Sequence, residues 1–343
     1  PASHIARLVD GALAAGPVER GMSAAGSRST AQLVSVADPG DPVAGYLRAD
    51  DVVVVTGGAR GVTLASVAAM SRHSDHQTRF VLLGRTDIDA DDPPWATDTD
   101  DTELLRAAAL AASPGVRPAE VERSVRAVLI RREVRRGVDS LRAGGAQIEY
   151  HAVDVRDTGA VSALIDEVHR RIGPVTGVVH GAGVLADRRI QDKTDSQFAE
   201  VFDTKVVGLQ NLLDAVDATA AAELRVLTIF SSSTARFGRQ GQADYAMANE
   251  VLNKIACQMQ TTHPNCRTLA LNWGPWQGGM VTDELGAMFV AEGVGLIPLD
   301  RGAEWLAAAI GVIPGPEVVV TATPADQNDG DSYTLAVEHR VDI

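Results

Sequence analysis

Short apolar runs rich in β-branched residues alternate with longer stretches of helical period along residues 51–321. Residues 51–56 (DVVVVT) contain an unbroken run of valines, which is typical of a strand buried on both faces of a sheet. Similar runs predict further strands at residues 79–84, 147–155, 175–179, 225–230, 268–272 and 317–321. Helical period is found between them, at residues 62–71, 158–172, 196–216 and 245–262. The alternation predicts right-handed crossovers and a parallel sheet, so we expect a doubly wound α/β fold.

One segment breaks this alternation. More than 60 residues separate the second and third predicted strands, far more than a crossover needs. Residues 87–103 carry eight acidic side chains and no basic one, which favours a solvated, mobile loop. Residues 121–142 carry seven arginines at mixed helical spacing and predict an exposed basic helix. A docking surface for an acidic partner is the alternative interpretation of that helix. We treat residues 87–142 as a long insertion.

The two ends of the chain differ from its centre in composition. Residues 1–50 are rich in Ala, Gly, Ser and Pro, and predict an arm with a short amphipathic stretch at 4–15 and a linker at 27–45. Residues 326–343 are interpreted as a C-terminal linker. The chain opens PASHIARLVD, without an initiator Met or a signal peptide, which suggests a fragment of a longer polypeptide.

Composition excludes several functions. The chain has 343 residues, of which 45% are hydrophobic, and 31 basic against 45 acidic side chains give a net charge of −14. This charge argues against binding to nucleic acid or to an anionic membrane. No apolar run reaches the roughly 18 residues that a membrane span needs. Two cysteines cannot form a disulfide framework, and no Cys or His cluster has metal-ligand spacing. We therefore expect a cytoplasmic protein without a metal.

A glycine-rich turn follows the first predicted strand and opens the first helix. Such a turn lets the backbone approach a pyrophosphate, while the helix N-terminus supplies free N–H groups. The second strand ends in Gly84 and Arg85, without the acid that usually holds the ribose of NAD. Arg85 and Arg60 suit a 2′-phosphate, so we predict NADPH as the cofactor. The candidate cofactor residues at these and later strand ends are Thr56, Gly57, Gly58, Arg60, Gly61, Val62, Arg85, Asp154, Val155, Gly181, Ala182 and Gly183.

A candidate catalytic set follows the fourth and fifth strands. Ser232 ends the fifth strand, and Tyr245 opens a helix 13 residues later. A free tyrosine has a pKa of about 10 and is a reluctant acid or base at neutral pH. A neighbouring hydroxyl and a nearby cation would favour its phenolate. Ser232 and Lys205 can supply these two groups.

The ordered motifs TGGARG, LLGR, DV, HGAG, SSS and YAMAN resemble the short-chain dehydrogenase/reductase superfamily, whose domains have a Rossmann fold. Most members carry Tyr-x-x-x-Lys, whereas this chain has Asn249 four residues after Tyr245. With the lysine at Lys205 instead, the pattern is similar to the ketoreductase domains of type I polyketide and fatty acid synthases. Lys193 and Lys254 are the competing lysines. The segment NWGPW also resembles the family's segment beside the nicotinamide, which adds Gly274 and Pro275 to the cofactor residues.

The resemblance extends over roughly residues 50–322, and it is closest to ketoreductases of iterative synthases that make polyunsaturated fatty acids or enediynes. It implies a catalytic domain at 51–325 that reduces a β-ketoacyl thioester carried by an acyl carrier protein domain. Tyr245 would donate the proton, Asn249 would hold a proton relay, and residues 280–297 would form a substrate lid. Residues 337–343 resemble the start of a dehydratase domain, which would then lie downstream.

Three departures from the family are informative. From the resemblance we expect that the structural half that precedes complete polyketide ketoreductases is absent or reduced to a remnant within residues 1–50. Asp187 retains only the last acid of a Leu-Asp-Asp motif, and Phe237 replaces a Trp; together they favour a D (3R) product. Arg188 and Arg239 could meet an acidic carrier, although a solvated surface role is the simpler interpretation of each.

Two other functions remain open from the sequence. A freestanding short-chain alcohol or sugar dehydrogenase would show activity on free alcohols without preferring thioesters. An inactive ketoreductase fold kept for architecture would usually have lost the tyrosine or the cofactor loop, and this chain retains both.

Overall fold

The computed structural model describes residues 21–22, 28–35, 39–40, 46–219, 224–313, 315–322 and 332–341. Within them, seven parallel strands form a sheet in the order β9-β8-β7-β6-β3-β4-β5. The chain starts at the centre of this sheet, builds outward to β5 and then returns to extend the other side, as doubly wound folds do. The predicted fold class is therefore confirmed. The strands are β3 (Val52–Thr56), β4 (Arg79–Gly84), β5 (Gln147–Ala152), β6 (Val175–His180), β7 (Val226–Ser232), β8 (Arg267–Trp273) and β9 (Glu317–Ala322).

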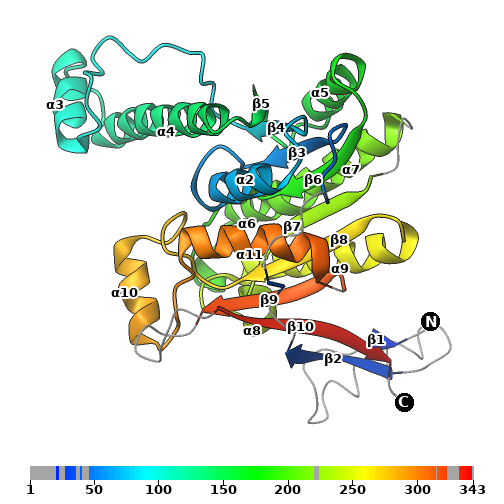
Figure 1. The fold of residues 1–343 in the computed structure, drawn as a ribbon. Helices are drawn as coiled ribbons and strands as arrows, with labels where there is room; N and C mark the ends of the chain where they lie inside the picture. Colours follow the sequence, from blue (N-terminus) through cyan, green and yellow to red (C-terminus); the bar gives the residue numbers. More distant parts are fainter. Residues whose placement is uncertain are drawn as a thin grey trace.

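Helices cover both faces of the sheet and bury two separate cores (Figure 1). One face packs on α2 (Gly61–His73), α11 (Leu299–Val312) and the inner end of α4. The opposite face packs on α5 (Thr158–Arg171), α7 (Gly208–Thr219) and α9 (Ala243–Thr262). The central strands are buried on both sides, which explains why their sequences are continuously apolar rather than alternating. The shorter elements are η1 (Ile190–Asp192), α6 (Asp195–Phe202), η2 (Asp203–Val207), α8 (Thr234–Phe237) and α10 (Asp283–Ala291).

Antiparallel strands extend the sheet beyond β9. Strand β10 (Ser332–Val341) pairs with both β9 and β2 (Arg28–Ser35), and β1 (Gly21–Met22) pairs with β2. The sequence predicted linkers at 27–45 and 326–343, so β2 and β10 are a difference from that expectation. Their pairing joins two segments about 300 residues apart in the chain, which no local sequence pattern signals. The amphipathic stretch at 4–15 lies outside the described residues.

The insertion forms a helical hairpin whose outer part stands away from the sheet (Figure 1). Helices α3 (Thr102–Ala112) and α4 (Pro118–Ala143) enclose a small core of their own around Leu105 and Val125. The acidic segment before α3 is fastened to α4, in contrast to the unattached, solvated loop that its composition suggested. Arg131 and Arg132 both pair with Asp92, and Arg132, Arg136 and Asp100 form a second group.

The helix predicted at 196–216 is interrupted. A π-helical segment, η2, separates α6 from α7. Such segments are rare and are frequent at functional sites. Lys205 lies within η2.

No helix in the described part of the chain combines the length and apolar character needed to cross a membrane. Those residues also contain no group of three or more His, Cys, Asp or Glu side chains arranged to hold a metal ion.

Candidate active site

A cleft of about 680 Å³ opens at the carboxyl ends of the parallel strands. Loops after β3, β4, β5, β6, β7 and β8 all contribute to it, and α10 borders it. This is the edge at which doubly wound sheets bind ligands. Of the predicted site residues, Thr56, Gly58 and Asn249 lie behind the surface of the cleft and all the others line it.

The glycine-rich turn forms a close-fitting cradle beside β6. Gly57 has a φ of +71°, which favours glycine, and a Cβ at this position would lie 3.0 Å from the carbonyl oxygen of Gly181. Helix α2 begins at Gly61, and the side chain of its N-cap residue, Arg60, makes no capping hydrogen bond. The first N–H groups of α2 are therefore left for a ligand, which is the arrangement that accepts phosphate.

Lys205 and Tyr245 meet at the centre of the cleft. The Nζ atom of Lys205 lies 5.3 Å from the centroid of the Tyr245 ring and donates a hydrogen bond of 2.9 Å to the carbonyl of Phe230. A Cβ on Gly183 would lie 3.1 Å from Cε of Lys205, so glycine leaves room for this lysine. Ser232 lines the same cleft, and its Oγ accepts the N–H of Thr234.

Burial shifts the pKa of both central groups. It lowers the pKa of Lys205 to about 7, because the charged form loses its hydration. It raises the pKa of Tyr245 to about 12, and the charge of Asp187 adds to this rise. Tyr245 is therefore a neutral phenol at neutral pH, and the charged form of Lys205 is much less favoured than in a free lysine.

Asn249 lies one helical turn after Tyr245 and binds its backbone. Its Nδ2 donates to the backbone carbonyl of Tyr245, at 2.8 Å. Its Oδ1 is fully buried and has no hydrogen-bond partner among the described residues. Such an atom needs a partner, and a water molecule would satisfy it.

His180, which no sequence pattern singled out, is a buried residue that connects elements of the site. It is fully buried, and burial lowers its pKa to about 3, so its ring is neutral. The carbonyl of Lys205 can only accept, so Nε2 of His180 carries the proton and donates to it at 2.9 Å. Nδ1 then accepts from Thr56 Oγ1, which in turn accepts the N–H of Ala182. One chain of hydrogen bonds thus connects the glycine-rich cradle to the π-helical segment that carries Lys205.

The low pKa of Lys205 predicts a pH-dependent stability. Between pH 7 and about 10.5 the unfolded lysine holds a proton that the folded one lacks. The free energy of unfolding should therefore rise with pH across this window, by up to about 1.4 kcal/mol per pH unit from this group. We expect Lys205→Met to remove that part of the rise, as measured by urea unfolding from pH 7 to 9.5.

Lys254 is the control for this experiment. It lies on α9 with its side chain 46% exposed and pairs with Glu250. Lys254→Met should keep the wild-type slope. If Lys205→Met also kept it, the buried lysine would not be neutral in the folded protein.

The other two lysines weighed from the sequence have different surroundings. Lys193 forms a buried ion pair with Asp244, and its Nζ also donates to the carbonyl of Ala186. Lys254 does not line the cleft and pairs with Glu250 on the surface. Of the three lysines, only Lys205 lines the cleft.

The loops at the mouth of the cleft are connected by hydrogen bonds, a stacking contact and an ion pair. Asp187 accepts a 2.8 Å hydrogen bond from Gln242 Nε2, and the N–H of Arg188 donates to the carbonyl of Gly241. Arg239 stacks on Phe289 of α10, with its guanidinium carbon 4.2 Å from the ring centroid, and pairs with Glu292. Arg239, which the sequence alone offers as a contact for an acidic carrier, thus contacts the predicted lid.

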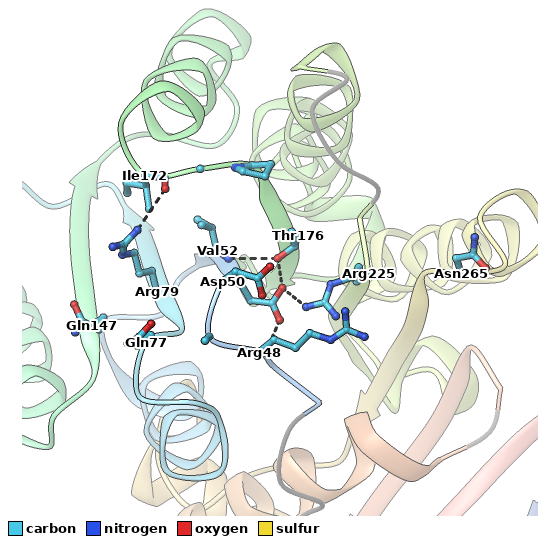
Figure 2. Close-up of a pocket in the computed structure, with 14 residues that line it drawn as sticks. Arg48, Asp50, Val52, Gln77, Arg79, Gln147, Ile172, Thr176, Arg225 and Asn265 are labelled. Carbon is cyan, nitrogen blue, oxygen red and sulfur yellow. Dashed lines mark hydrogen bonds and ion pairs between the residues drawn. The ribbon is translucent and has the colours of Figure 1, made fainter.

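A second pocket lies at the opposite, amino ends of the strands (Figure 2). Its polar lining surrounds the buried carboxylate of Asp51, which accepts from the N–H of Arg48 and from the side chains of Thr176 and Arg225. These contacts fasten the starts of neighbouring strands. The pocket has none of the candidate catalytic residues.

Solved structures share this architecture. A ketoreductase domain from the bacillaene assembly line matches with a TM-score of 0.63 and 25% identity, over 83% of this chain and 59% of that one. The first-module ketoreductase of phoslactomycin biosynthesis from Streptomyces sp. HK803 matches with a TM-score of 0.58 and 27% identity, over 82% and 54% of the two chains. The fold and the site define a short-chain dehydrogenase/reductase-type ketoreductase.

Sequence comparison gives the particular family. The model of the KR domain matches residues 52–278, and the chain belongs to this family. It is 35% identical over 329 residues to a polyunsaturated fatty acid synthase polypeptide from Thraustochytrium sp., which covers 92% of this chain and 11% of that protein. It is also 38% identical over 170 residues to erythronolide synthase EryA2 from Saccharopolyspora erythraea, over 48% of this chain and 4% of that one. The chain thus spans a small part of the synthases that it matches.

Proposed function

We propose that this domain uses NADPH to reduce a β-ketoacyl thioester to the β-hydroxyacyl thioester. The observation that carries the proposal is the placement of Lys205 against the ring of Tyr245, in a cleft that also holds Ser232 and a glycine-rich cradle. When bound, the reduced nicotinamide would supply the hydride.

The protein's own residues would handle the charge on the substrate oxygen. Tyr245, a neutral phenol with a pKa of about 12, would donate its proton to that oxygen. Ser232 would donate a second hydrogen bond to it. The phenolate left on Tyr245 would be stabilised by the protonated form of Lys205, and a water on Asn249 Oδ1 would return the proton.

The residues present fit the proposed cofactor. Gly57 and Gly181 leave space that a Cβ would fill, and the N-terminus of α2 faces the same cleft. Arg60 and Arg85 line the part of the cleft beside Tyr150 and are the proposed ligands of the 2′-phosphate. Gly274 and Pro275, after β8, would border the nicotinamide.

The substrate would be delivered by a carrier domain of a larger synthase. We propose that residues 51–325 form the catalytic domain and that a dehydratase domain lies downstream. Phe237 and Met280 line the cleft with 60% and 50% of their surfaces exposed, and they would contact the acyl chain or its arm. We retain the D (3R) outcome as a proposal for Asp187.

Arg85 provides a test of cofactor choice. We expect Arg85→Ala to raise the Kd for NADPH by about 10- to 100-fold, because hydrogen bonds to charged groups contribute about 1.5–3 kcal/mol. The Kd for NADH should not change. Arg79, an exposed arginine at the other end of the same strand, is the control, and Arg79→Ala should leave both affinities as they are. An equal rise in the Kd for both cofactors would show that Arg85 does not bind the 2′-phosphate.

The activity itself is tested by NADPH oxidation with a short β-ketoacyl thioester. Turnover that prefers the thioester over free ketones would support the proposal. Reduction of small free ketones with no such preference, or oxidation of small free alcohols with NADP⁺, would instead support a freestanding dehydrogenase.

A further inference from the structure

The insertion contributes directly to the proposed cofactor site. Ile130, Glu133 and Val134, all on α4, line the cleft. The helix is held there by close packing, since a Cβ on Gly137 would lie 2.3 Å from the carbonyl oxygen of Ala59. Val134 is also buried in the core beside the sheet. The inner end of α4 is therefore a fixed wall of the cleft.

Glu133 reaches from this wall to one of the two proposed phosphate ligands. Its Oε2 lies 3.5 Å from an Nη of Arg60, and the two side chains are 48% and 51% exposed. An ion pair so exposed contributes little to folding. The position of this ion pair is relevant to the proposed cofactor site, because Arg60 is the N-cap residue of α2 in the glycine-rich turn.

We propose that Glu133 is a specificity-determining residue, which competes with the 2′-phosphate of the cofactor for Arg60. This inference rests on the proposed use of NADPH. The guanidinium of Arg60 cannot keep its contact with Glu133 and also pair fully with a phosphate dianion. NADPH must therefore break the Glu133–Arg60 ion pair when it binds, which lowers its affinity. NADH has a hydroxyl in place of the phosphate and leaves the Glu133–Arg60 pair intact. Glu133 thus reduces the preference of the protein for NADPH over NADH.

The test compares the Kd values of NADPH and NADH for the full chain and for Glu133→Gln. We expect NADPH to bind about two- to fivefold more tightly to the variant, the fold-change that corresponds to one exposed ion pair. The Kd for NADH should stay the same. The difference between variant and wild type should shrink at high salt, because exposed charges are screened.

Glu122 is a matched control on the same helix. It is paired with Arg106 at the outer end of the hairpin and is 50% exposed. Glu122→Gln should leave both Kd values unchanged. A second comparison uses Arg60→Ala, in which the competition cannot occur. Adding Glu133→Gln to that variant should have no further effect on NADPH binding.

The outcomes separate the inference from the proposed function. A wild-type chain that binds NADH as tightly as NADPH would overturn both. A wild-type chain that prefers NADPH, with the same preference in Glu133→Gln, would overturn the inference alone. Weaker NADH binding in Glu133→Gln would overturn it too, by making the carboxylate a ligand of the ribose. An effect that persists in the Arg60→Ala background would show direct repulsion of the phosphate instead of competition.

Discussion

Tyr245→Phe is expected to lower kcat for the reduction of a β-ketoacyl thioester by about 10²- to 10⁴-fold, the usual contribution of a positioned proton donor. The substitution removes only the hydroxyl from a ring that is 8% exposed, so the packing around Lys205 is kept. The Kd for NADPH should therefore not change. Steady-state NADPH oxidation and a separate cofactor titration measure the two quantities.

Tyr46→Phe is the matched control. Tyr46 packs against the core beside the sheet, and its buried hydroxyl has no hydrogen-bond partner in the described part of the chain. The loss of that hydroxyl should leave kcat unchanged. If Tyr245→Phe retained wild-type kcat, the proton would have to come from another group.

Lys193→Met is expected to lower the free energy of unfolding by about 3–5 kcal/mol, the range seen when one partner of a buried ion pair is removed. The side chains of Lys193 and Asp244 are only 4% and 2% exposed, and their charged atoms lie 2.7 Å apart. Methionine replaces the apolar stem of the lysine but leaves the carboxylate of Asp244 buried and uncompensated. Urea unfolding at neutral pH measures the change.

Two further variants isolate the cause. The double variant Lys193→Met, Asp244→Asn has no charge at either position of this pair, and the asparagine would keep a side-chain oxygen for the N–H of Tyr245. Most of the lost stability should therefore return. Lys254→Met breaks the exposed pair with Glu250 and should cost less than about 1 kcal/mol. A double variant as unstable as Lys193→Met would point to packing rather than charge.

The parallel strands could be predicted from the sequence because their signal is local. Each is a run of apolar residues between turns, and the observed ends differ from the predicted ones by no more than three residues. The site residues at the strand ends follow from that prediction, because carboxyl ends of parallel strands meet at one edge. The catalytic roles given to Lys205 and Tyr245 remain predictions.

Features that depend on distant partners could not be predicted. The helix at 196–216 has an unbroken helical period, yet it contains η2, where His180 from β6 binds the carbonyl of Lys205. The acidic residues of the insertion appeared unpaired because their partners, such as Arg131 and Arg132, lie 30–40 residues later. Glu133 carried no signal in the sequence, since nothing local indicates that α4 packs against Ala59.

The packing of α4 also determines where this insertion can vary in length. Surface insertions are ordinarily the places where a chain tolerates gained or lost residues. Here the outer part of the hairpin has its own small core and can lengthen or shorten without reaching the sheet. A single deletion between Ile130 and Gly137 would instead rotate the rest of α4 by about 100°. The glycine would then turn away from Ala59, so this stretch of the insertion is as constrained in register as a strand of the sheet.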